Sequence, residues 1–504
     1  MTSANLRDVG ARALAVPRRH PLFAAAFAVA SVLRIIAMLG YTPAMWFTDS
    51  YEYVSVALNP RPHQIRPDGY SFWLLLLKPF HSFSLVVFTQ HLMGLATAVL
   101  IYLLLRRRFG LPAWGATLAA APVLFDGYQI QLEHLILSDA MFTLIVVALI
   151  TLLLWHRKPS LMIATWIGLL LALAALTRTI GLPILALVVA YLIVKRVGWR
   201  PITAVVVVCA APVLAYMAWF ASVFDGRFAM TNSDGVILYM RTAIFADCAK
   251  MNPEPELVPL CIKEPVDKRT ESQRYLWNDY ESPLHRLGGY KFNAYQNEVA
   301  GRFAREAILK QPGDYLAVVA RDFMRTFQWD RPIFPDRKTW ARYQFRPLGA
   351  EEKHLPKWRV DRRGGTAAED AARYEAGNPE TQVVAPWAGI MQTYQGIFFL
   401  RGTLLGGILL IGLAGIVVRW RKLGGPVLLP WLAAVGLLLA PAATAEFDYR
   451  YVLPAVPLAC LAAAITLRHG LPWLRLPFLR RADSTPPPAS PPLHTDTRVP
   501  VSAR

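Results

Sequence analysis

The sequence is poor in charged residues. Only 17% of its 504 residues are Asp, Glu, Lys or Arg, whereas a soluble globular chain carries about 25%. Hydrophobic residues make up 55% of the chain, and the mean hydropathy is +0.34. These values argue against a disordered or an ordinary cytosolic protein and indicate that much of the chain lies in lipid.

Acidic residues are scarcer than basic ones, which gives a formal net charge of +19. Such a balance can indicate a nucleic-acid partner. However, residues 222–386 hold 25 basic and 23 acidic residues and are nearly neutral. The basic excess lies in short stretches between apolar runs, without the aromatic residues that would accompany a phosphate-tracking patch. We therefore expect no nucleic acid among the partners.

The chain has only four cysteines. Cys209 and Cys460 fall in apolar runs, where a cysteine usually packs as a small side chain. Cys248 and Cys261 fall in a polar segment, 13 positions apart. If that segment is outside the cell, an oxidising environment lets them form a disulfide. The alternative is two reduced thiols.

Long apolar runs are abundant. A run of about 17–25 residues can cross the hydrocarbon core as a helix, since every backbone group must be paired there. The sequence predicts an all-α polytopic membrane protein of about ten transmembrane helices, with an extracytoplasmic insertion of mixed secondary structure before the last three. The predicted spans are 21–40, 84–105, 111–125, 135–155, 160–176, 182–195, 202–221, 397–418, 425–442 and 452–467.

The distribution of Lys and Arg orients these spans. With the N-terminus in the cytoplasm, 19 basic residues fall on the inner side and 5 in the short outer loops, as the positive-inside rule requires. We expect a multi-pass protein of the cell membrane, with both termini cytoplasmic and an uncleaved first span. Its predicted parts are a basic N-terminus (1–20), a bundle (21–221) with catalytic outer loops (41–83 and 126–139), an extracytoplasmic domain (222–396), three final helices (397–467) and a basic, Pro-rich tail (468–504).

In this topology the acidic residues between the two tails and outside 222–386 all lie on the outer side. Carboxylates that merely decorate exposed loops would explain their absence from lipid but not from the inner loops. The pattern favours a polar cavity at the outer membrane face. The residues are Asp49, Glu52, Asp68, Asp126, Glu133, Asp139, Glu446 and Asp448.

The first outer loop carries Asp49 and Glu52 just after the first span. They can form a capping box at a short interfacial helix, or face the cavity. Further along, Arg66, Asp68 and Tyr70 belong to an Arg-Pro-Asp-Gly-Tyr turn, which sets a cation and a carboxylate close together.

Other outer residues add ligand-like groups. Glu133 and His134 precede the fourth span, and Asp139 lies near its start. All three are metal-ligand types without a strong metal spacing, so a divalent metal ion stays open as a cofactor. Asp448 and Arg450 lie in the last outer loop.

Two further arginines stand at membrane positions. Arg34 lies inside the first span, where a charge marks either a site or a snorkelling anchor. Arg178 lies at the tip of the hairpin between the fifth and sixth spans, where it can anchor the interface or contact a lipid phosphate.

Taken together, these motifs resemble the GT-C superfamily of integral-membrane glycosyltransferases, especially its branch with phospholipid carriers, which includes protein O-mannosyltransferases and lipid A aminoarabinose transferases. The resemblance covers roughly residues 20–330 and 397–467. It is carried by Asp49 and by the segments 66–70, 132–139, 177–182, 304–315 and 450–454 in this order.

The resemblance implies a sugar donor built on a polyprenyl phosphate, a lipid, glycan or protein acceptor in the cell envelope, and Asp49 as the base of an outer-facing active site. One departure is that Asp49 is followed by Ser50, whereas protein mannosyltransferases carry Asp-Glu there; this puts a protein acceptor in doubt. The second loop has no Asp-x-Asp, which argues against a metal-dependent oligosaccharyltransferase.

We therefore expect transfer of a sugar to an acceptor by one displacement with inversion. Asp49 would accept the acceptor's proton, and arginines would hold the leaving phosphate. Two alternatives remain: a transporter or flippase of lipid-linked sugars, and a non-catalytic membrane assembly protein. A transporter would be expected to show repeat symmetry and interrupted half-helices, which the sequence lacks.

Overall fold

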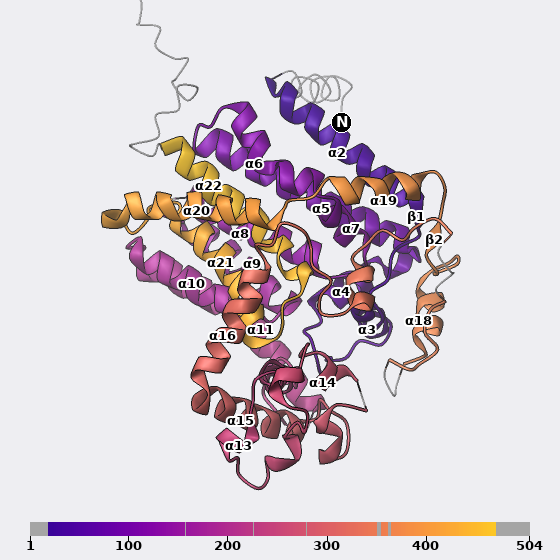
Figure 1. Ribbon diagram of the computed structural model, residues 1–504. Coiled ribbons are helices and arrows are strands. Elements are labelled where there is room, and N and C mark those ends of the chain that lie inside the picture. The colour runs from indigo at the N-terminus through magenta and orange to yellow at the C-terminus, as the bar shows by residue number, and fades with distance from the viewer. Residues whose placement is uncertain are drawn as a thin grey trace, which may run out of the picture.

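The computed structural model describes residues 19–469, apart from 157, 225, 279, 350–353 and 361–363. The regular secondary structure of this part of the chain is almost entirely helical (Figure 1). Its one sheet has two strands, β1 (Tyr41–Thr42) and β2 (Gln382–Val383), paired antiparallel.

Each of the ten predicted spans has a helix. Four segments, which contain α2, α5, α11 and α22, are long and apolar enough to cross a membrane, and α20 joins them if it and α19 (Trp387–Ile397), which meet at a bend of 53°, form one span. The other five are shorter, so the chain is a multi-pass membrane protein whose number of spans stays a prediction. The helices are α2 (Pro21–Gly40), α5 (Phe83–Leu103), α6 (Ala113–Phe125), α8 (Asp139–Trp155), α9 (Leu161–Thr177), α10 (Gly181–Val194), α11 (Trp199–Val223), α20 (Gly402–Val418), α21 (Leu428–Thr444) and α22 (Val456–His469).

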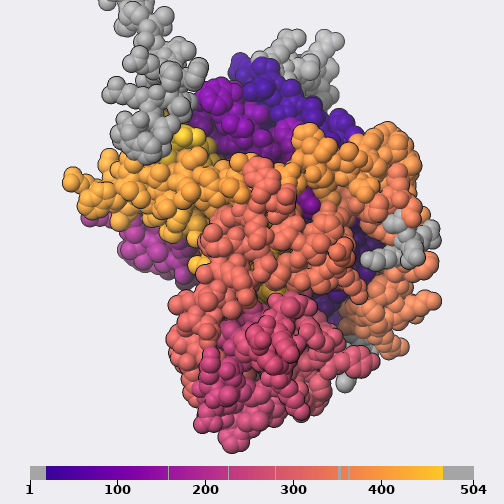
Figure 2. All heavy atoms as spheres, viewed as in Figure 1, coloured from indigo at the N-terminus to yellow at the C-terminus, as the bar shows by residue number. Residues whose placement is uncertain are grey.

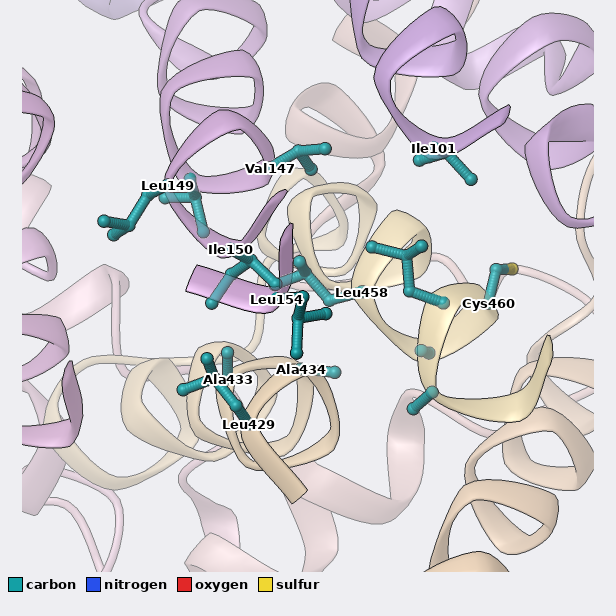
Figure 3. Close-up of a cluster of buried hydrophobic side chains, with 14 of the residues drawn as sticks. Ile101, Val147, Leu149, Ile150, Leu154, Leu429, Ala433, Ala434, Leu458 and Cys460 are labelled. Atoms are coloured by element: carbon teal, nitrogen blue, oxygen red, sulfur yellow. The ribbon is translucent and has the colours of Figure 1, made fainter. Parts of the chain in front are cut away.

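These helices pack around one large apolar core. Ile101, Ile150, Ala434 and Leu458 come from α5, α8, α21 and α22 and meet within it (Figure 3). Small residues let neighbouring helices approach closely: a Cβ at Gly168 of α9 would lie 2.8 Å from the carbonyl oxygen of Val205 in α11. The packed bundle thereby supports the loops at its ends.

The long segment before α19 forms helices rather than the predicted mixture of helix and sheet, and its only described strand has two residues. The physical reason is that its apolar residues recur at helical spacing. The helices of the segment are α12 (Asp234–Thr242), α13 (Cys248–Met251), α14 (Arg274–Trp277), α15 (Ala294–Lys310), α16 (Pro312–Arg325), α17 (Arg337–Arg342) and α18 (Ala367–Tyr374). The part of this segment that contains α13, α14 and α15 projects from the bundle as a lobe, at the bottom of Figure 1 and Figure 2, and α16 packs against α21 of the bundle. Within the lobe, Cys248 and Cys261 form a disulfide.

The second half of that segment returns to the bundle and covers the first outer loop. The β1–β2 pairing joins it to the end of α2, against which α19 also packs. The ring of Tyr374 stacks on that of Phe83 at 4.6 Å, and its hydroxyl donates to the carbonyl oxygen of Leu74 at 2.6 Å. Residues far apart in sequence are thus brought over the same end of the bundle.

The first described helix begins on the side of the molecule where the last one ends. The start of α2 and the end of α22 lie on the side of the molecule opposite α13 and α15 (Figure 1). Which of these sides faces the cytoplasm stays a prediction.

Candidate functional site

The first outer loop forms two short helices, α3 (Thr48–Leu58) and α4 (Gly69–Leu77). The α3 helix is not capped by Asp49 and Glu52. Instead, the backbone NH of Phe47 donates to the Ser50 hydroxyl at 2.9 Å. Both carboxylates are therefore left to interact with side chains from other segments.

Asp49 lies between two arginines. Its Oδ1 is 3.3 Å from Nη2 of Arg66, and its Oδ2 accepts a hydrogen bond from Nη1 of Arg450 at 2.7 Å. The side chain keeps 13% of its surface exposed. Arg66 lies 17 positions after Asp49 in the sequence, and Arg450 lies 401 positions after it, so the fold brings the three side chains together.

Glu52 forms an ion pair with Nη1 of the same Arg66. It keeps 17% of its surface exposed, and the imidazole of His63 lies 3.9 Å from its Oε2. Arg66 is therefore shared between two carboxylates that lie one helical turn apart on α3.

Arg450 and Arg178 extend this arrangement around Tyr451. The guanidinium carbon of each lies 5.2 Å from the centre of the Tyr451 ring. Arg178 forms an ion pair with Asp139, which is 1% exposed, and Nε of Arg450 is 3.6 Å from Oδ2 of Asp448.

We call this group the arginine–carboxylate cluster. Four carboxylates face three guanidinium groups in it, and they come from four separate segments between the bundle helices. Its members are Asp49, Glu52, Arg66, Asp139, Arg178, Asp448, Arg450 and Tyr451.

Burial and the neighbouring arginines shift the pKa values of these carboxyl groups in different directions. Burial opposes ionisation of Asp49, but Arg450 and Arg66 outweigh it and hold the pKa of Asp49 below its usual range. Burial raises the pKa of Glu52 to about 7, an effect that Arg66 opposes and the charge of Asp49 reinforces. Burial likewise raises the pKa of Asp448. Two neighbouring carboxyl groups therefore differ strongly in basicity, a common feature of acid–base sites.

Chemically, the cluster can bind an anion and accept a proton. Guanidinium groups bind phosphate oxygens bidentately, and Arg66, Arg178 and Arg450 are only 11–17% exposed, where such contacts are little screened by water. The carboxylates balance this charge in the absence of a ligand.

The carboxylates do not fit a divalent metal ion as arranged. Both oxygens of Asp49 and Oε2 of Glu52 face guanidinium groups. Within residues 19–469 that the structure describes, no group of three or more His, Cys, Asp or Glu side chains could hold a metal ion.

Asp68 and Tyr70 lie beside the cluster but have other partners. Asp68 is buried and accepts from the Tyr216 hydroxyl at 3.1 Å, and burial raises its pKa to about 8. The Tyr70 hydroxyl donates to Oε1 of Gln90 at 2.5 Å. Between them, a Cβ at Gly69 would be 2.6 Å from the carbonyl oxygen of Leu176, at the end of α9. The turn thus fixes Arg66 against the bundle.

Arg34, Glu133 and His134 form a separate network in the bundle. Arg34 binds Glu133 through Nε at 2.8 Å and Nη2 at 3.0 Å. His91 is 3.0 Å from Glu133 and 3.1 Å from His134, which is 2.7 Å from the carbonyl oxygen of Tyr41. At most 3% of any of these side chains is exposed. Their contacts connect helices and loops rather than reach a cavity.

Three residues in or beside the cluster were not predicted from the sequence. Tyr343 donates to Oδ2 of Asp448 at 2.8 Å, and Arg342 contacts the Thr48 hydroxyl. Both come from α17 and the residue after it, in the long segment, where no motif marks them. Tyr451 adjoins Arg450 in sequence, and the Tyr-Arg-Tyr triplet was its only signal.

Comparisons with known proteins found no matching family model and no matching curated protein. Among solved structures, the chain is similar to AglB, an oligosaccharyltransferase from Archaeoglobus fulgidus, in complex with an inhibitory peptide and a dolichol-phosphate; the identity is 14% over 88% of this chain, with a TM-score of 0.42. The chain spans about half of that AglB chain (50%).

A second similar structure is ArnT from Cupriavidus metallidurans bound to undecaprenyl phosphate. The identity is 12% over 90% of this chain and 77% of ArnT, with a TM-score of 0.32. Both neighbours are GT-C membrane glycosyltransferases, the superfamily that the sequence motifs resemble. Because these similarities are distant, the function proposed for this chain rests on its own site.

Proposed function

We propose that the protein is a membrane glycosyltransferase that moves a sugar from a polyprenyl-phosphate donor to an acceptor at the extracytoplasmic face of the cell membrane. The observation that carries this proposal is the arginine–carboxylate cluster, in which Asp49 lies between Arg66 and Arg450 at one end of an apolar helix bundle. The acceptor is a lipid, glycan or protein of the cell envelope.

In this reaction the arginines hold the phosphate. Glycosyl transfer passes through a sugar with oxocarbenium character, and the departing phosphate gains negative charge. Arg66, Arg178 and Arg450 supply guanidinium groups from three different segments. Positive groups fixed in advance where charge develops stabilise the transition state.

Asp49 acts as the base and accepts the proton of the acceptor hydroxyl. Its low pKa keeps it ionised but makes it a weak base in the free enzyme. A phosphate competes with Asp49 for Arg66 and Arg450. Donor binding therefore raises the basicity of Asp49 at the moment when a base is needed, and a single attack by the acceptor inverts the anomeric centre.

Glu52 supports the donor site through Arg66. Because its pKa is raised to about 7, it is also the specific competitor of Asp49 for the role of base. The two residues are matched for a direct comparison, since both pair with Arg66 from neighbouring turns of α3.

The test uses purified wild type, Asp49→Asn and Glu52→Gln proteins with a panel of polyprenyl-phosphate sugars. Donor consumption is followed by mass spectrometry, and donor binding and thermal unfolding are measured on the same samples. We expect Asp49→Asn to lose transfer by about 10²–10⁴-fold, the range for loss of a general base, with folding and donor binding retained. Glu52→Gln should keep measurable turnover.

Four outcomes decide between the assignments. Normal turnover by Asp49→Asn removes Asp49 as the base. An inactive Glu52→Gln protein beside an active Asp49→Asn protein transfers that role to Glu52. Movement of intact lipid-linked sugar across vesicles, without donor consumption, favours the transporter. No donor binding and no turnover favour the assembly protein.

A further inference from the structure

Glu446 belongs to the loop that follows α21, two residues before Asp448 of the cluster. Its carboxylate reaches into the long segment before α19. There Oε1 accepts a hydrogen bond from the backbone NH of Ser272 at 2.6 Å, and Oε2 accepts one from that of Gln273 at 3.2 Å. Only 3% of Glu446 is exposed. The loop is thereby joined to the residues directly before α14.

A buried ion pair contacts the backbone on both sides of Glu446. Nη1 of Arg241 in α12 donates to Oδ2 of Asp322 in α16 at 2.6 Å, and neither side chain is more than 2% exposed. The same Nη1 lies 3.5 Å from the carbonyl oxygen of Ala445, and the same Oδ2 accepts from the backbone NH of Phe447 at 3.4 Å. Buried charges need such additional hydrogen bonds, and the loop backbone supplies part of them.

From this point the chain leads directly into the cluster. Oδ1 of Asp448 accepts from the backbone NH of Arg450 at 3.2 Å, and its Oδ2 accepts from the Tyr343 hydroxyl at 2.8 Å. Arg450 then donates to Asp49 at 2.7 Å. Glu446 is thus four residues from the guanidinium group that binds the proposed base.

We propose that Glu446 is a positioning residue, which fixes the start of this loop to the long segment and thereby holds Arg450 beside Asp49. The inference rests on the proposed function, in which Arg450 binds the donor phosphate and sets the basicity of Asp49. Without the hydrogen bonds of Glu446, the loop backbone gains freedom and Arg450 leaves its place for part of the time. The helices α12, α14 and α16, which touch no reacting group, then act on the reaction through this loop.

Asn297 of α15 provides a matched control for a purely stabilising role. Its Oδ1 accepts from the backbone NH groups of Gly235 and Val236 at 2.9 and 3.1 Å, and only 2% of the residue is exposed. Its amide nitrogen donates to Asp234, so these contacts all lie within the long segment. Asn297→Ala therefore leaves two buried backbone NH groups without their acceptor, as Glu446→Ala does, but far from the cluster in sequence.

Tyr315 of α16 offers a milder change at the same loop. Its hydroxyl donates to the carbonyl oxygen of Ala443 at 3.0 Å. Tyr315→Phe removes this hydrogen bond and keeps the ring, so the variant should fold. It tests the same coupling with a smaller perturbation.

Hydrogen exchange of the full-length protein in lipid nanodiscs tests the positioning without any substrate. Peptides that cover residues 443–451 are followed by mass spectrometry. We expect their amides to exchange about tenfold faster in Glu446→Ala than in the wild type, because an amide is protected only while its local structure stays closed. Tyr315→Phe should show a smaller increase, and Asn297→Ala should keep the wild-type rate in this loop.

Two results of this experiment overturn the proposal. The first is a wild-type exchange rate of the loop in Glu446→Ala, or in Tyr315→Phe if Glu446→Ala does not fold. The second is an equal acceleration in Asn297→Ala, which would mean that any loss of stability in the long segment loosens the loop.

The pH dependence of transfer tests the effect on the site. In Glu446→Ala we expect kcat/KM to fall about 10–10²-fold, as for a small displacement of a catalytic group. The pKa of Asp49 rises when Arg450 is no longer held beside it; since a base works only when ionised, the acidic limb should move to higher pH. Burial raises the pKa of Glu446 itself to about 8, which Asp322 reinforces and Arg241 opposes, so its own titration lies above that limb.

The kinetic outcomes separate this inference from the proposed function. An acidic limb that stays in place in Glu446→Ala, or that shifts equally in Asn297→Ala, overturns the positioning role, because a purely structural loss lowers the amount of active enzyme and leaves its pH dependence unchanged. Faster exchange of the loop in Glu446→Ala, without transfer of any sugar by the wild type, removes the proposed enzyme and leaves Glu446 as the residue that fixes this loop.

Discussion

Arg450 is the residue that most directly links the two chemical tasks of the site. It binds Oδ2 of Asp49 at 2.7 Å and lies 3.6 Å from Asp448, and its guanidinium group faces the rings of Phe47 and Tyr451 at 5.1 and 5.2 Å. A side chain held from four directions is positioned before any ligand arrives. Its charge also keeps the carboxyl group of Asp49 ionised.

Arg450→Gln should therefore change both the rate and its pH dependence. Loss of one preorganised positive group should lower kcat/KM by about 10²-fold. Removing its charge raises the pKa of Asp49; since a base works only when ionised, the acidic limb of the kcat/KM profile should move to higher pH. The measurement is kcat/KM across acidic and neutral pH. Arg302→Gln, which removes an exposed ion pair with Glu254 and Glu256 in the lobe, is the control; an unshifted limb in Arg450→Gln would contradict the coupling.

At the scale of elements, the Arg34 network joins the first span to the second outer loop. Besides Glu133, Arg34 donates to the carbonyl oxygens of Val123 and Leu124 at the end of α6. A Cβ at Gly94 of α5 would lie 1.9 Å from Oε1 of Glu133, so glycine makes room for this carboxylate. The network fixes α2, α5, α6 and α7 (Gly127–His134) in one arrangement.

Arg34→Met should consequently affect stability before chemistry. It leaves the Glu133 carboxylate buried without its main partner, which costs about 3–5 kcal/mol. Thermal unfolding in detergent should show a large fall in Tm, whereas Lys310→Met, which removes the exposed pair with Glu306, should cost about 1 kcal/mol or less. A stable Arg34→Met protein with impaired donor binding would place Arg34 in the donor site.

At the scale of the whole molecule, the lobe and the ends of the described chain lie at opposite sides of the bundle (Figure 1). The segment that returns from the lobe contacts the cluster, since Tyr343 of that segment donates a hydrogen bond to Asp448. The proposed orientation, with both termini cytoplasmic, therefore puts the active site outside the cell.

Labelling of single cysteines tests this orientation. Tyr280 in the lobe is 96% exposed, and Lys158, between α8 and α9, is also exposed. In intact cells, a membrane-impermeant thiol reagent should label Tyr280→Cys and should label Lys158→Cys only after lysis. The unmodified protein is the control, because Cys209 and Cys460 are buried and the other two cysteines form a disulfide. The reverse pattern would put the cluster in the cytoplasm.

The sequence by itself determined the class of the protein and its helices. Apolar runs specify membrane helices through local chemistry, because each helix pairs its own backbone groups; a helix therefore stands at every predicted span. The confinement of carboxylates to the loops that the sequence predicts to be outside likewise indicated Asp49, Glu52 and Asp448 as members of a polar site.

Only the tertiary structure decided which of the selected residues meet. Asp49 and Arg450 are separated by 401 positions, and no local pattern encodes a contact of that range. Arg34 and Glu133 looked equally functional in sequence, yet the fold buries them in a network of their own. Tyr343 contacts Asp448 of the site, although no sequence motif marks it. The physical reason is that a helix or a turn forms from interactions between near neighbours, whereas a cluster of side chains exists only once the helices that carry it have packed.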